Sequence, residues 1–216
     1  MARGRPREHD LDTLLDHARA LWVEQGRAGV TIRALSARSG VGNGAIYHAL
    51  GSRAGLLART WVREAEGFLA FQRARVEDVL AGDGSTRAAV EAVVAAALAP
   101  ATYAEAHPEA ARLLLATHAA DLLVDELGDD DRAAIGSLQT RLGALLAELA
   151  AQLWGSADRT TVALARICVV DLPGTLLLGE GRPDDPVARH ALEAAVRGVL
   201  ASPPPEREVR RTVGRT

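Results

Sequence analysis

Residues 39–50 read SGVGNGAIYHAL and hold the residue types best suited to contacting phosphate groups. Three glycines fall within five positions, and Tyr47 and His48 follow directly. Glycine lets a backbone approach an anion closely, while a phenol and an imidazole can donate hydrogen bonds to phosphate. Glycine also weakens a helix by about 1 kcal/mol relative to alanine. The stretch is therefore either a nucleotide-binding loop or a turn between two helices.

The turn between helices is the better interpretation of this stretch. A dinucleotide-binding loop follows a buried strand and has the spacing GxGxxG. Here the preceding residues read TIRALSARS, with helical spacing and two arginines, and the glycines are spaced GxGxG. A helix-turn-helix instead joins two short helices through a few residues that include glycine. Gly40 would then supply a left-handed turn, Gly42 would begin the second helix, and Val41 and Ile46 would face the core. A helical hairpin with two surface aromatic residues remains the alternative.

The rest of the chain predicts further helices and no strand. Alanine and leucine dominate, aromatic residues make up only 3%, and β-branched runs are few, which favours an all-α fold. Thr31 and Ser52 are expected to cap helices, and Pro100 is expected to end one. The predicted helical segments are approximately 10–26, 31–39, 43–50, 53–81, 86–99, 108–127, 131–154, the apolar segment 159–179, and 186–201.

Charge is distributed unevenly along the 216 residues. Residues 1–63 hold ten arginines against five acidic residues, whereas residues 64–216 hold fifteen against twenty-three. A basic N-terminal part on an acidic remainder suggests that this part alone meets a polyanion, with ordinary surface scatter as the alternative. The single cysteine allows no internal disulfide. With no apolar run near the roughly 20 residues of a membrane span and no secretory signal, we expect a cytoplasmic protein.

The helix-turn-helix carries a family resemblance. Residues 10–60 contain LWVEQG, then TIRALSARSGVG, then NGAIYHALGSRAGLL. Together these segments resemble the DNA-binding domain of the TetR family of bacterial one-component transcriptional repressors, over about a quarter of the chain. The resemblance implies a three-helix helix-turn-helix domain joined by a long helix to an all-helical effector-binding and dimerisation domain. The expected division is a flexible basic arm at 1–9, the DNA-binding domain at 10–60, the effector-binding and dimerisation domain at 61–201, and a disordered tail at 202–216.

The resemblance also implies which residues meet double-stranded DNA. Expected phosphate contacts come from Thr31, Tyr47, His48 and Arg53. Base or backbone contacts are expected from Arg33, Gly42, Asn43, Gly44 and Ala45, where the Asn43 amide could bind adenine and the Ala45 methyl could touch thymine. The chain departs from the family pattern at Ser36, Gly42, Ala49, Leu50 and Arg53. Gly42 lacks a phosphate-binding hydroxyl, and Ala49 with Leu50 weakens the phosphate contacts, so the sequence read by the domain stays open.

The first residues form a second candidate DNA contact. Arg3-Gly4-Arg5-Pro6 resembles the AT-hook core, an extended segment that lies in a narrow minor groove. Narrow A·T-rich grooves attract arginine through their enhanced negative potential. A basic terminus that is simply solvated remains the alternative.

Residues 64–201 hold no catalytic or metal-binding motif, such as HExxH, CxxC, GxSxG or a Walker loop. We predict no metal and no cofactor. Apolar helices with a few polar groups suggest instead a small-molecule cavity. The candidate lining residues are Trp61, Phe68, Phe71, Gln72, Tyr103, Arg112, His118, Gln139, Trp154 and Asp171. Each of these is also compatible with an ordinary core or surface position.

The segment 159–179 is apolar nearly all round, and the last helical segment is rich in small residues. Helices that are apolar on all sides must be buried on every side, and a single chain of this size could bury one of them centrally. The family resemblance implies a four-helix bundle made with the same segments of a second chain. The candidate interface residues are Leu164, Ile167, Leu176, Leu178, Leu192, Val196 and Val199.

Two functions follow as hypotheses. The first is a homodimeric repressor, released from a pseudo-palindromic operator by a small apolar or amphipathic effector. The second is a small helical enzyme or partner-binding protein without specific DNA binding.

Overall fold

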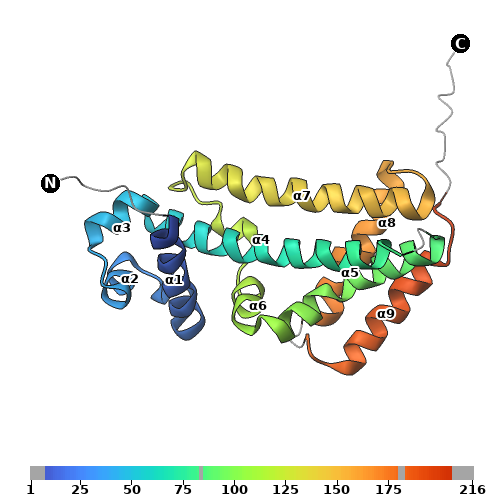
Figure 1. Ribbon diagram of the computed structural model, residues 1–216, viewed down its shortest axis with the longest axis horizontal. Helices are drawn as coiled ribbons and strands as arrows, with labels where there is room; N and C mark the ends of the chain where they lie inside the picture. The colour runs from blue at the N-terminus through green and yellow to red at the C-terminus, as the bar shows by residue number, and fades with distance from the viewer. Residues whose placement is uncertain (1–7, 83–84, 180–182, 206–216) are drawn as a thin grey trace, which may run out of the picture.

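The computed structural model describes residues 8–82, 85–179 and 183–205, and in these ranges it contains helices and turns but no strand (Figure 1). This confirms the all-α prediction. The arm residues 1–7 and the tail residues 206–216 lie outside the described ranges. The elements are α1 (Glu8–Gly29), α2 (Ile32–Ser39), α3 (Asn43–Leu50), α4 (Arg53–Leu80), α5 (Thr86–Ala106), α6 (Pro108–Leu115), η1 (Ala119–Leu122), α7 (Asp129–Trp154), α8 (Arg159–Arg166), η2 (Ile167–Asp171), η3 (Gly174–Leu178) and α9 (Pro186–Leu200).

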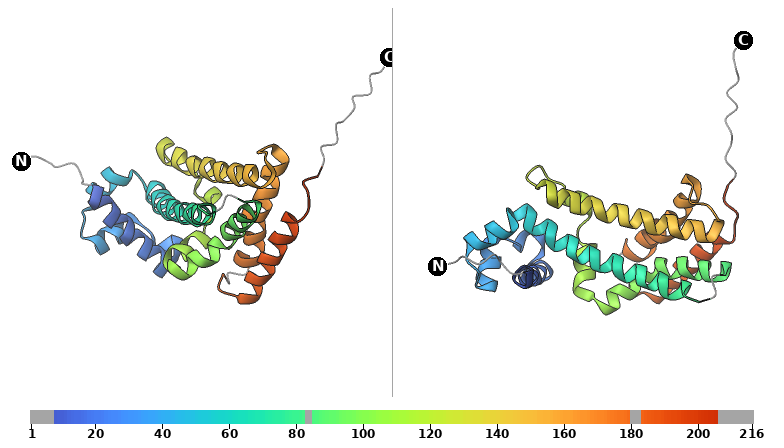
Figure 2. Two further views of the ribbon diagram at one scale, coloured as in Figure 1. Left: turned by 45° about the vertical axis from the view of Figure 1, so that its right-hand side comes forward. Right: turned by 45° about the horizontal axis from the view of Figure 1, so that its top comes forward.

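The molecule is elongated, with two parts joined by the long helix α4 (Figures 1 and 2). We call α1–α3 the head and α5–α9 the body. α4 begins beside the head, where Leu56 and Leu57 join its apolar core. It ends in the body, where Val76 packs with residues of α5 and α7. One continuous helix therefore belongs to both parts.

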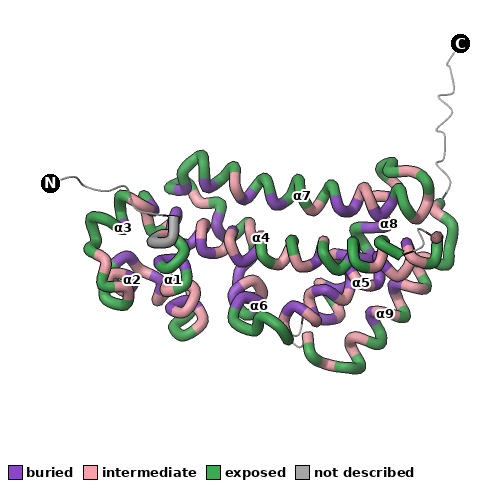
Figure 3. The backbone as a smooth tube through the Cα atoms, viewed as in Figure 1, coloured by how far each residue is buried: buried purple, intermediate pink, exposed green. Residues whose placement is uncertain are grey.

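The core of the head extends into the body. Trp22, Ile46 and Leu50 of the head are at most 2% exposed and belong to the same apolar cluster as Leu113 of α6 and Ile135 of α7. Buried positions accordingly line the faces of α1, α4 and α6 where they meet (Figure 3). The head is thus packed against α6 and the start of α7 rather than hanging free from α4.

Several element boundaries differ from the sequence prediction. α5 does not end at Pro100 but continues through it to Ala106. The predicted helix 108–127 is instead the short α6 followed by the 3-10 turn η1. The segment 159–179 begins as α8 and widens into the π-helical stretches η2 and η3. The break predicted near Gly26 is present as a kink within α1, where Gly26 has φ 71°.

Two helical segments are long and apolar enough to cross a membrane by length and composition, namely Thr86–Ala106 and Arg159–Leu178. This corrects the expectation that no apolar run was long enough, because so few charges interrupt either segment. Core helices of soluble proteins pass the same test, and half of the α5 window is buried inside the chain.

Candidate nucleic-acid interface

The turn between α2 and α3 is built by local hydrogen bonds that the sequence dictates. Thr31 caps α2, its Oγ1 accepting a hydrogen bond from the Ala34 N–H at 3.1 Å. Gly40 ends α2 at φ 73°, a left-handed conformation that favours glycine, and its N–H donates to the Ser36 carbonyl at 2.9 Å. Gly42 then begins α3, with its carbonyl accepting from Ala45 N–H and Ile46 N–H. These caps hold α3 at a fixed angle to α2.

Helix α3 has one buried and one exposed face. Ile46 and Leu50 are 0% and 1% exposed and fix the inner face in the core of the head. The outer face carries every α3 residue that the sequence predicts to contact DNA. Tyr47 is 54% exposed, and the others on this surface are Asn43, Gly44, Ala45 and His48, preceded by the exposed Gly42. The structure therefore brings these candidates together on one solvent-facing surface.

Gly44 has no structural role within the chain. A Cβ added to it would meet no atom within 4 Å, and its φ is not positive. Because glycine in a helix costs about 1 kcal/mol relative to alanine, the fold by itself would favour alanine here. The fold therefore does not require glycine at this position, and the close approach of a DNA backbone to Gly44 stays a prediction.

The remaining candidates of this interface differ in their surroundings. Arg33 is exposed on α2 beside α3. Thr31 is half-buried and already serves as the cap of α2. Arg53 is exposed, but its Nε and Nη2 donate to the carbonyls of Val30 and Arg27 at 2.8 and 2.7 Å. Its guanidinium thus holds the loop between α1 and α2 in place. Arg3 and Arg5 of the arm lie outside the described residues.

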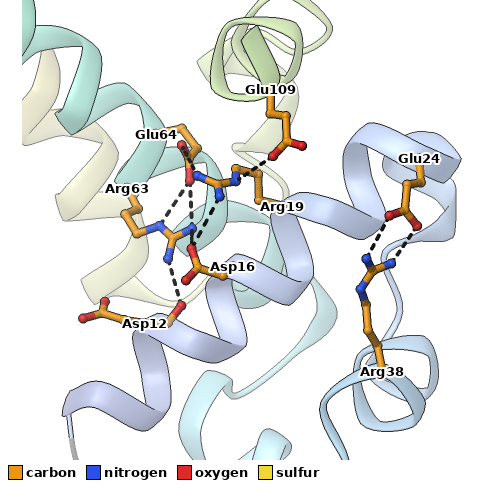
Figure 4. Close-up of polar contacts among 8 residues, drawn as sticks. All are labelled: Asp12, Asp16, Arg19, Glu24, Arg38, Arg63, Glu64 and Glu109. Carbon is orange, nitrogen blue, oxygen red and sulfur yellow. Dashed lines mark hydrogen bonds and ion pairs between the residues drawn. The ribbon is translucent and has the colours of Figure 1, made fainter. Parts of the chain in front are cut away.

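A bidentate ion pair fixes α2 against α1. Arg38 Nη1 and Nη2 donate to the two carboxylate oxygens of Glu24 at 2.6 and 2.8 Å (Figure 4). The hydrogen bond from Arg38 lowers the pKa of Glu24 below its ordinary value. The pair is exposed at the surface and helps to orient α2.

A second polar cluster joins the head to the body. Glu64 of α4 is 5% exposed and accepts hydrogen bonds from Arg63 Nε and Nη2 at 3.2 and 2.9 Å. Arg19 of α1 lies between Glu64 and Glu109 of α6, 3.6 Å from each carboxylate (Figure 4). Arg63 also reaches Asp16 of α1 at 3.0 Å. The cluster therefore ties α1 to both α4 and α6.

A third link joins the end of α3 to the start of α7. Arg59 of α4 donates from Nη1 to the Ala49 carbonyl and from Nε to Asp131 Oδ1, each at 2.7 Å. Gly55 of α4 is buried directly beside this link. A Cβ at Gly55 would lie 2.4 Å from the Leu50 carbonyl oxygen and 3.0 Å from Asp131 Oδ2. The exposed helix α3 is thus seated closely against α4 and α7.

An apolar cavity of about 190 Å³, partly open to solvent, lies between α4, α5, α6, α7 and the π-helical segment. Three predicted pocket residues line it: Phe68, Gln72 and Tyr103. Phe71 packs edge-on against the Tyr103 ring, with centroids 5.4 Å apart. The other lining residues are Pro100, Ala104, Ala111, Leu114, Leu115, Leu142, Val169, Val170, Pro173 and Leu178.

Six predicted pocket residues do not line this cavity. Three of them lie between the head and the body. Trp61 donates its indole N–H to the Thr117 carbonyl at 3.0 Å. Arg112 lines a separate pocket together with Trp22, and His118 precedes η1 as its N-cap. The other three lie on or near the surface: Gln139 is exposed, Trp154 packs at the end of α7, and Asp171 is exposed and lies 3.8 Å from Arg166.

The predicted dimer-interface residues fall into buried core positions, a cavity position and positions that are partly exposed. Leu192 and Val196 are both 0% exposed within the single chain, so they belong to its own core and have no surface left for a partner. Leu178 lines the cavity. Ile167 is 39% exposed, and the half-buried members of the set are Leu164, Leu176 and Val199.

Sequence reasoning missed the residues that join the two parts. Arg19, Arg59, Glu64 and Asp131 form the links between head and body, although they are distant in sequence. One signal was available, because Glu64 interrupts an otherwise apolar stripe of α4 that includes Trp61 and Phe68. A carboxylate in such a position is paired when it is buried.

The fold and this surface define a class of protein: a helical protein that presents a helix-turn-helix, the unit that places its second helix in the DNA major groove. Residues 14–60 match the family model described as bacterial regulatory proteins, tetR family. No curated protein matches the sequence.

Solved structures share the fold over nearly the whole chain. The TetR family transcriptional regulator PfmR from Thermus thermophilus has 20% identity and a TM-score of 0.59, covering 87% of this chain and 97% of its own. A TetR-like transcriptional regulator from a Rhodococcus species has 20% identity and a TM-score of 0.61, covering 93% and 100%. The multidrug binding protein EbrR, solved in complex with imidazole, has 16% identity and a TM-score of 0.61, covering 89% and 95%.

Residues 14–60 are therefore a DNA-binding domain of the tetR family type, and the chain as a whole has the fold of TetR-family transcriptional regulators. Proteins with this domain are DNA-binding regulators and not enzymes, which favours the first of the two functions that the sequence left open.

Proposed function

We propose that this regulator is a repressor that binds a pseudo-palindromic operator as a homodimer and leaves it when a small apolar or amphipathic effector occupies the body cavity. It would act in the cytoplasm, together with the DNA. One observation carries the proposal: the helices that line the cavity are the same helices that hold the head.

Helix α6 has both roles within eight residues. Ala111 and Leu114 line the cavity. Leu113, on another face of the same helix, is 1% exposed in the core that includes the head. Glu109, in its first turn, lies 3.6 Å from Arg19 of α1. A ligand that displaces α6 would thereby move the support of α1.

Helices α4 and α7 likewise contribute residues both to the cavity wall and to the contacts with the head. On α4, Phe68 and Gln72 line the cavity, while Arg59 holds the end of α3. On α7, Leu142 lines the cavity, while Asp131 receives the Arg59 guanidinium. Packed interiors respond to a change in volume by shifting whole elements, because they have few voids to absorb it. Filling the cavity would accordingly alter the orientation of the head.

The effector can act only through a difference in affinity between two states. It must bind the released conformation more tightly than the DNA-bound one, by about 10⁴-fold to reverse an equilibrium from 1:99 to 99:1. EbrR, which shares this fold, is a multidrug binding protein solved with imidazole. The cavity of about 190 Å³ in this chain is likewise suited to a small ligand.

A dimer is required by the geometry of DNA. Two α3 helices can read one palindrome only if they lie about 34 Å apart, one turn of the double helix. The exposed Ile167 on η2, with the half-buried Leu164 of α8 and Leu176 of η3, offers apolar surface for a second chain. Burying such surface is the usual source of affinity between identical subunits.

The test is operator affinity with and without effector candidates, measured by fluorescence anisotropy on DNA from upstream of the regulator's own gene. A panel of small lipophilic compounds should contain members that lower the affinity at least tenfold. Ala104→Leu, which would fill part of the cavity with its own side chain, should bind DNA more weakly than the wild type and lose this response. Ala106→Leu, at an exposed position of the same helix, should keep it. If the panel has no effect on either the wild type or the Ala106→Leu control, the release mechanism is wrong.

A further inference from the structure

Pro100 leaves an unused acceptor inside helix α5. In an α-helix the N–H of residue 100 would donate to the carbonyl of residue 96, but proline has no N–H. The Ala96 carbonyl is therefore free of its helical donor, although Ala96 is 0% exposed. A buried carbonyl without a partner is costly, so another donor is expected nearby.

Gln72 of α4 supplies that donor. Its Nε2 lies 2.9 Å from the Ala96 carbonyl oxygen, and the residue is 2% exposed. A carbonyl can only accept, so the amide group must present its NH₂ to Ala96. This fixes the orientation of the amide, which is otherwise assigned rather than observed.

The same bond leaves Gln72 Oε1 unpaired. Among the described residues, this oxygen is buried and has no hydrogen-bond partner. Gln72 also lines the body cavity, together with Pro100. A buried amide oxygen accepts up to two hydrogen bonds, and leaving both unmade is unfavourable. Gln72 is thus a cavity-lining residue whose amide oxygen is buried and lacks a donor.

The rest of the described cavity wall is uncharged. Its side chains are aliphatic or aromatic apart from the Gln72 amide and the Tyr103 phenol. Burial, with a smaller contribution from the Glu64 charge, raises the pKa of Tyr103 above its ordinary value of 10.0, so this phenol stays neutral at physiological pH. An ionised ligand group placed here would lose its hydration without gaining a counter-ion.

The cavity also limits the size of its ligand. Its volume of about 190 Å³ is comparable with the roughly 150 Å³ of an engineered apolar cavity that binds benzene. A ligand on the order of ten non-hydrogen atoms fits such a space without a large rearrangement.

We propose that the effector is a compact, uncharged and largely apolar molecule that donates one hydrogen bond, from a hydroxyl or an N–H group, to Gln72 Oε1. That this ligand acts as an effector depends on the proposed function, whereas its chemical class depends on the cavity alone. A ketone of the same size fits the volume but presents a second acceptor to Oε1. Carboxylates and ammonium ions fit the volume but not the uncharged wall.

Isothermal titration of the full chain with four probes of one carbon count tests this class directly. The probes are 1-octanol, which donates; 2-octanone, which only accepts; octanoate, an anion; and octylammonium, a cation. The wild type should bind 1-octanol roughly tenfold more tightly than each of the other three, the range expected for one buried hydrogen bond. Equal affinities for 1-octanol and 2-octanone, tighter binding of either ion, or no binding of 1-octanol up to its solubility would overturn the proposal.

A variant pair assigns the preference to Gln72. Gln72→Leu removes the acceptor but also leaves the Ala96 carbonyl unpaired, so it is made in a Pro100→Ala background, where alanine restores the helical N–H. Pro100→Ala alone should retain the preference for 1-octanol, and the double variant should bind 1-octanol and 2-octanone within twofold of each other. Retention of the tenfold preference in the double variant would show that another group accepts the hydrogen bond.

These titrations contain no DNA, so they separate the ligand class from the release mechanism. Preferential 1-octanol binding that leaves operator affinity unchanged would support the ligand class and count against release by this ligand. Release of DNA by octanoate or octylammonium, with 1-octanol bound no more tightly, would support an effector-controlled repressor and overturn the ligand class.

Discussion

The head and the body use their polar groups in opposite ways. On the head, α3 buries only Ile46 and Leu50 and exposes Tyr47, His48 and Asn43 to solvent. In the body, apolar side chains surround a cavity in which the unpaired polar atom is Gln72 Oε1. The exposed surface suits a large, charged and hydrated partner, whereas the apolar cavity suits a small and uncharged one. Helices α4, α6 and α7 contact both the head and the cavity, and the proposed release mechanism depends on these shared helices.

The largest effect is expected where the two regions meet. Gly55→Ala places a Cβ 2.4 Å from the Leu50 carbonyl oxygen, so α3 must shift away from α4. Overpacking of this kind typically destabilises a protein by about 1–3 kcal/mol. We expect a lower midpoint of thermal unfolding and at least a tenfold loss of DNA affinity, measured by calorimetry and by fluorescence anisotropy.

Gly136→Ala on α7 is the matched control for this change. Its added Cβ meets no atom within 4 Å, so the helix should gain up to about 1 kcal/mol and DNA binding should not change. Equal behaviour of the two variants would show that α3 is not seated through Gly55.

Gly44→Ala separates folding from DNA binding on the head itself. Its added Cβ meets no atom of the chain within 4 Å, so the unfolding free energy should rise by up to about 1 kcal/mol. The same methyl group would face the DNA backbone and should lower the affinity several-fold. Unchanged or tighter DNA binding would remove Gly44 from the interface.

Arg33→Ala should affect DNA binding and little else, because Arg33 is an exposed residue of α2. We expect weaker binding to all sequences and a salt dependence whose slope falls by about one, as for the loss of one phosphate contact. Arg75→Ala, at an exposed position of α4 far from α3, should leave both quantities unchanged. A loss confined to one operator sequence would instead indicate that Arg33 contacts a base.

The smallest effect concerns the surface pair between α1 and α2. Because Arg38 lowers the pKa of Glu24 in the folded chain, this pair stabilises the head above the ordinary Glu value of 4.5 and is lost as the pH falls through the lowered value. Glu24→Gln should therefore be slightly less stable than the wild type at neutral pH and equal to it in acid. A difference that persists in acid would come from packing and not from charge.

The head could be predicted from the sequence in detail because its structure depends on neighbours along the chain. The Thr31 cap, the left-handed Gly40 and the period that buries Ile46 and Leu50 are all encoded within twenty residues. Pro100 shows the limit of such local reasoning. It was expected to end a helix, but Gln72, from another helix, satisfies the carbonyl that Pro100 leaves free, and α5 continues.

The cavity and the supposed dimer face could be predicted only in part, because both depend on residues brought together from far along the chain. Phe68, Gln72 and Tyr103 were found from the mixture of aromatic and polar residues, whereas Gln139 was placed on the wrong side of α7. Leu192 and Val196 resemble Ile167 in type, and only their 0% exposure within one chain separates core from possible interface.

The binding of the chain to DNA from upstream of its own gene, measured by fluorescence anisotropy over a range of salt concentrations, tests the central claim most directly. We predict specific binding at physiological salt, with the logarithm of the affinity falling linearly as the logarithm of the salt concentration rises. Tyr47→Ala, which changes an exposed residue of α3, should weaken it. Binding that is absent at physiological salt, or that does not distinguish this DNA from an unrelated sequence, would contradict the account.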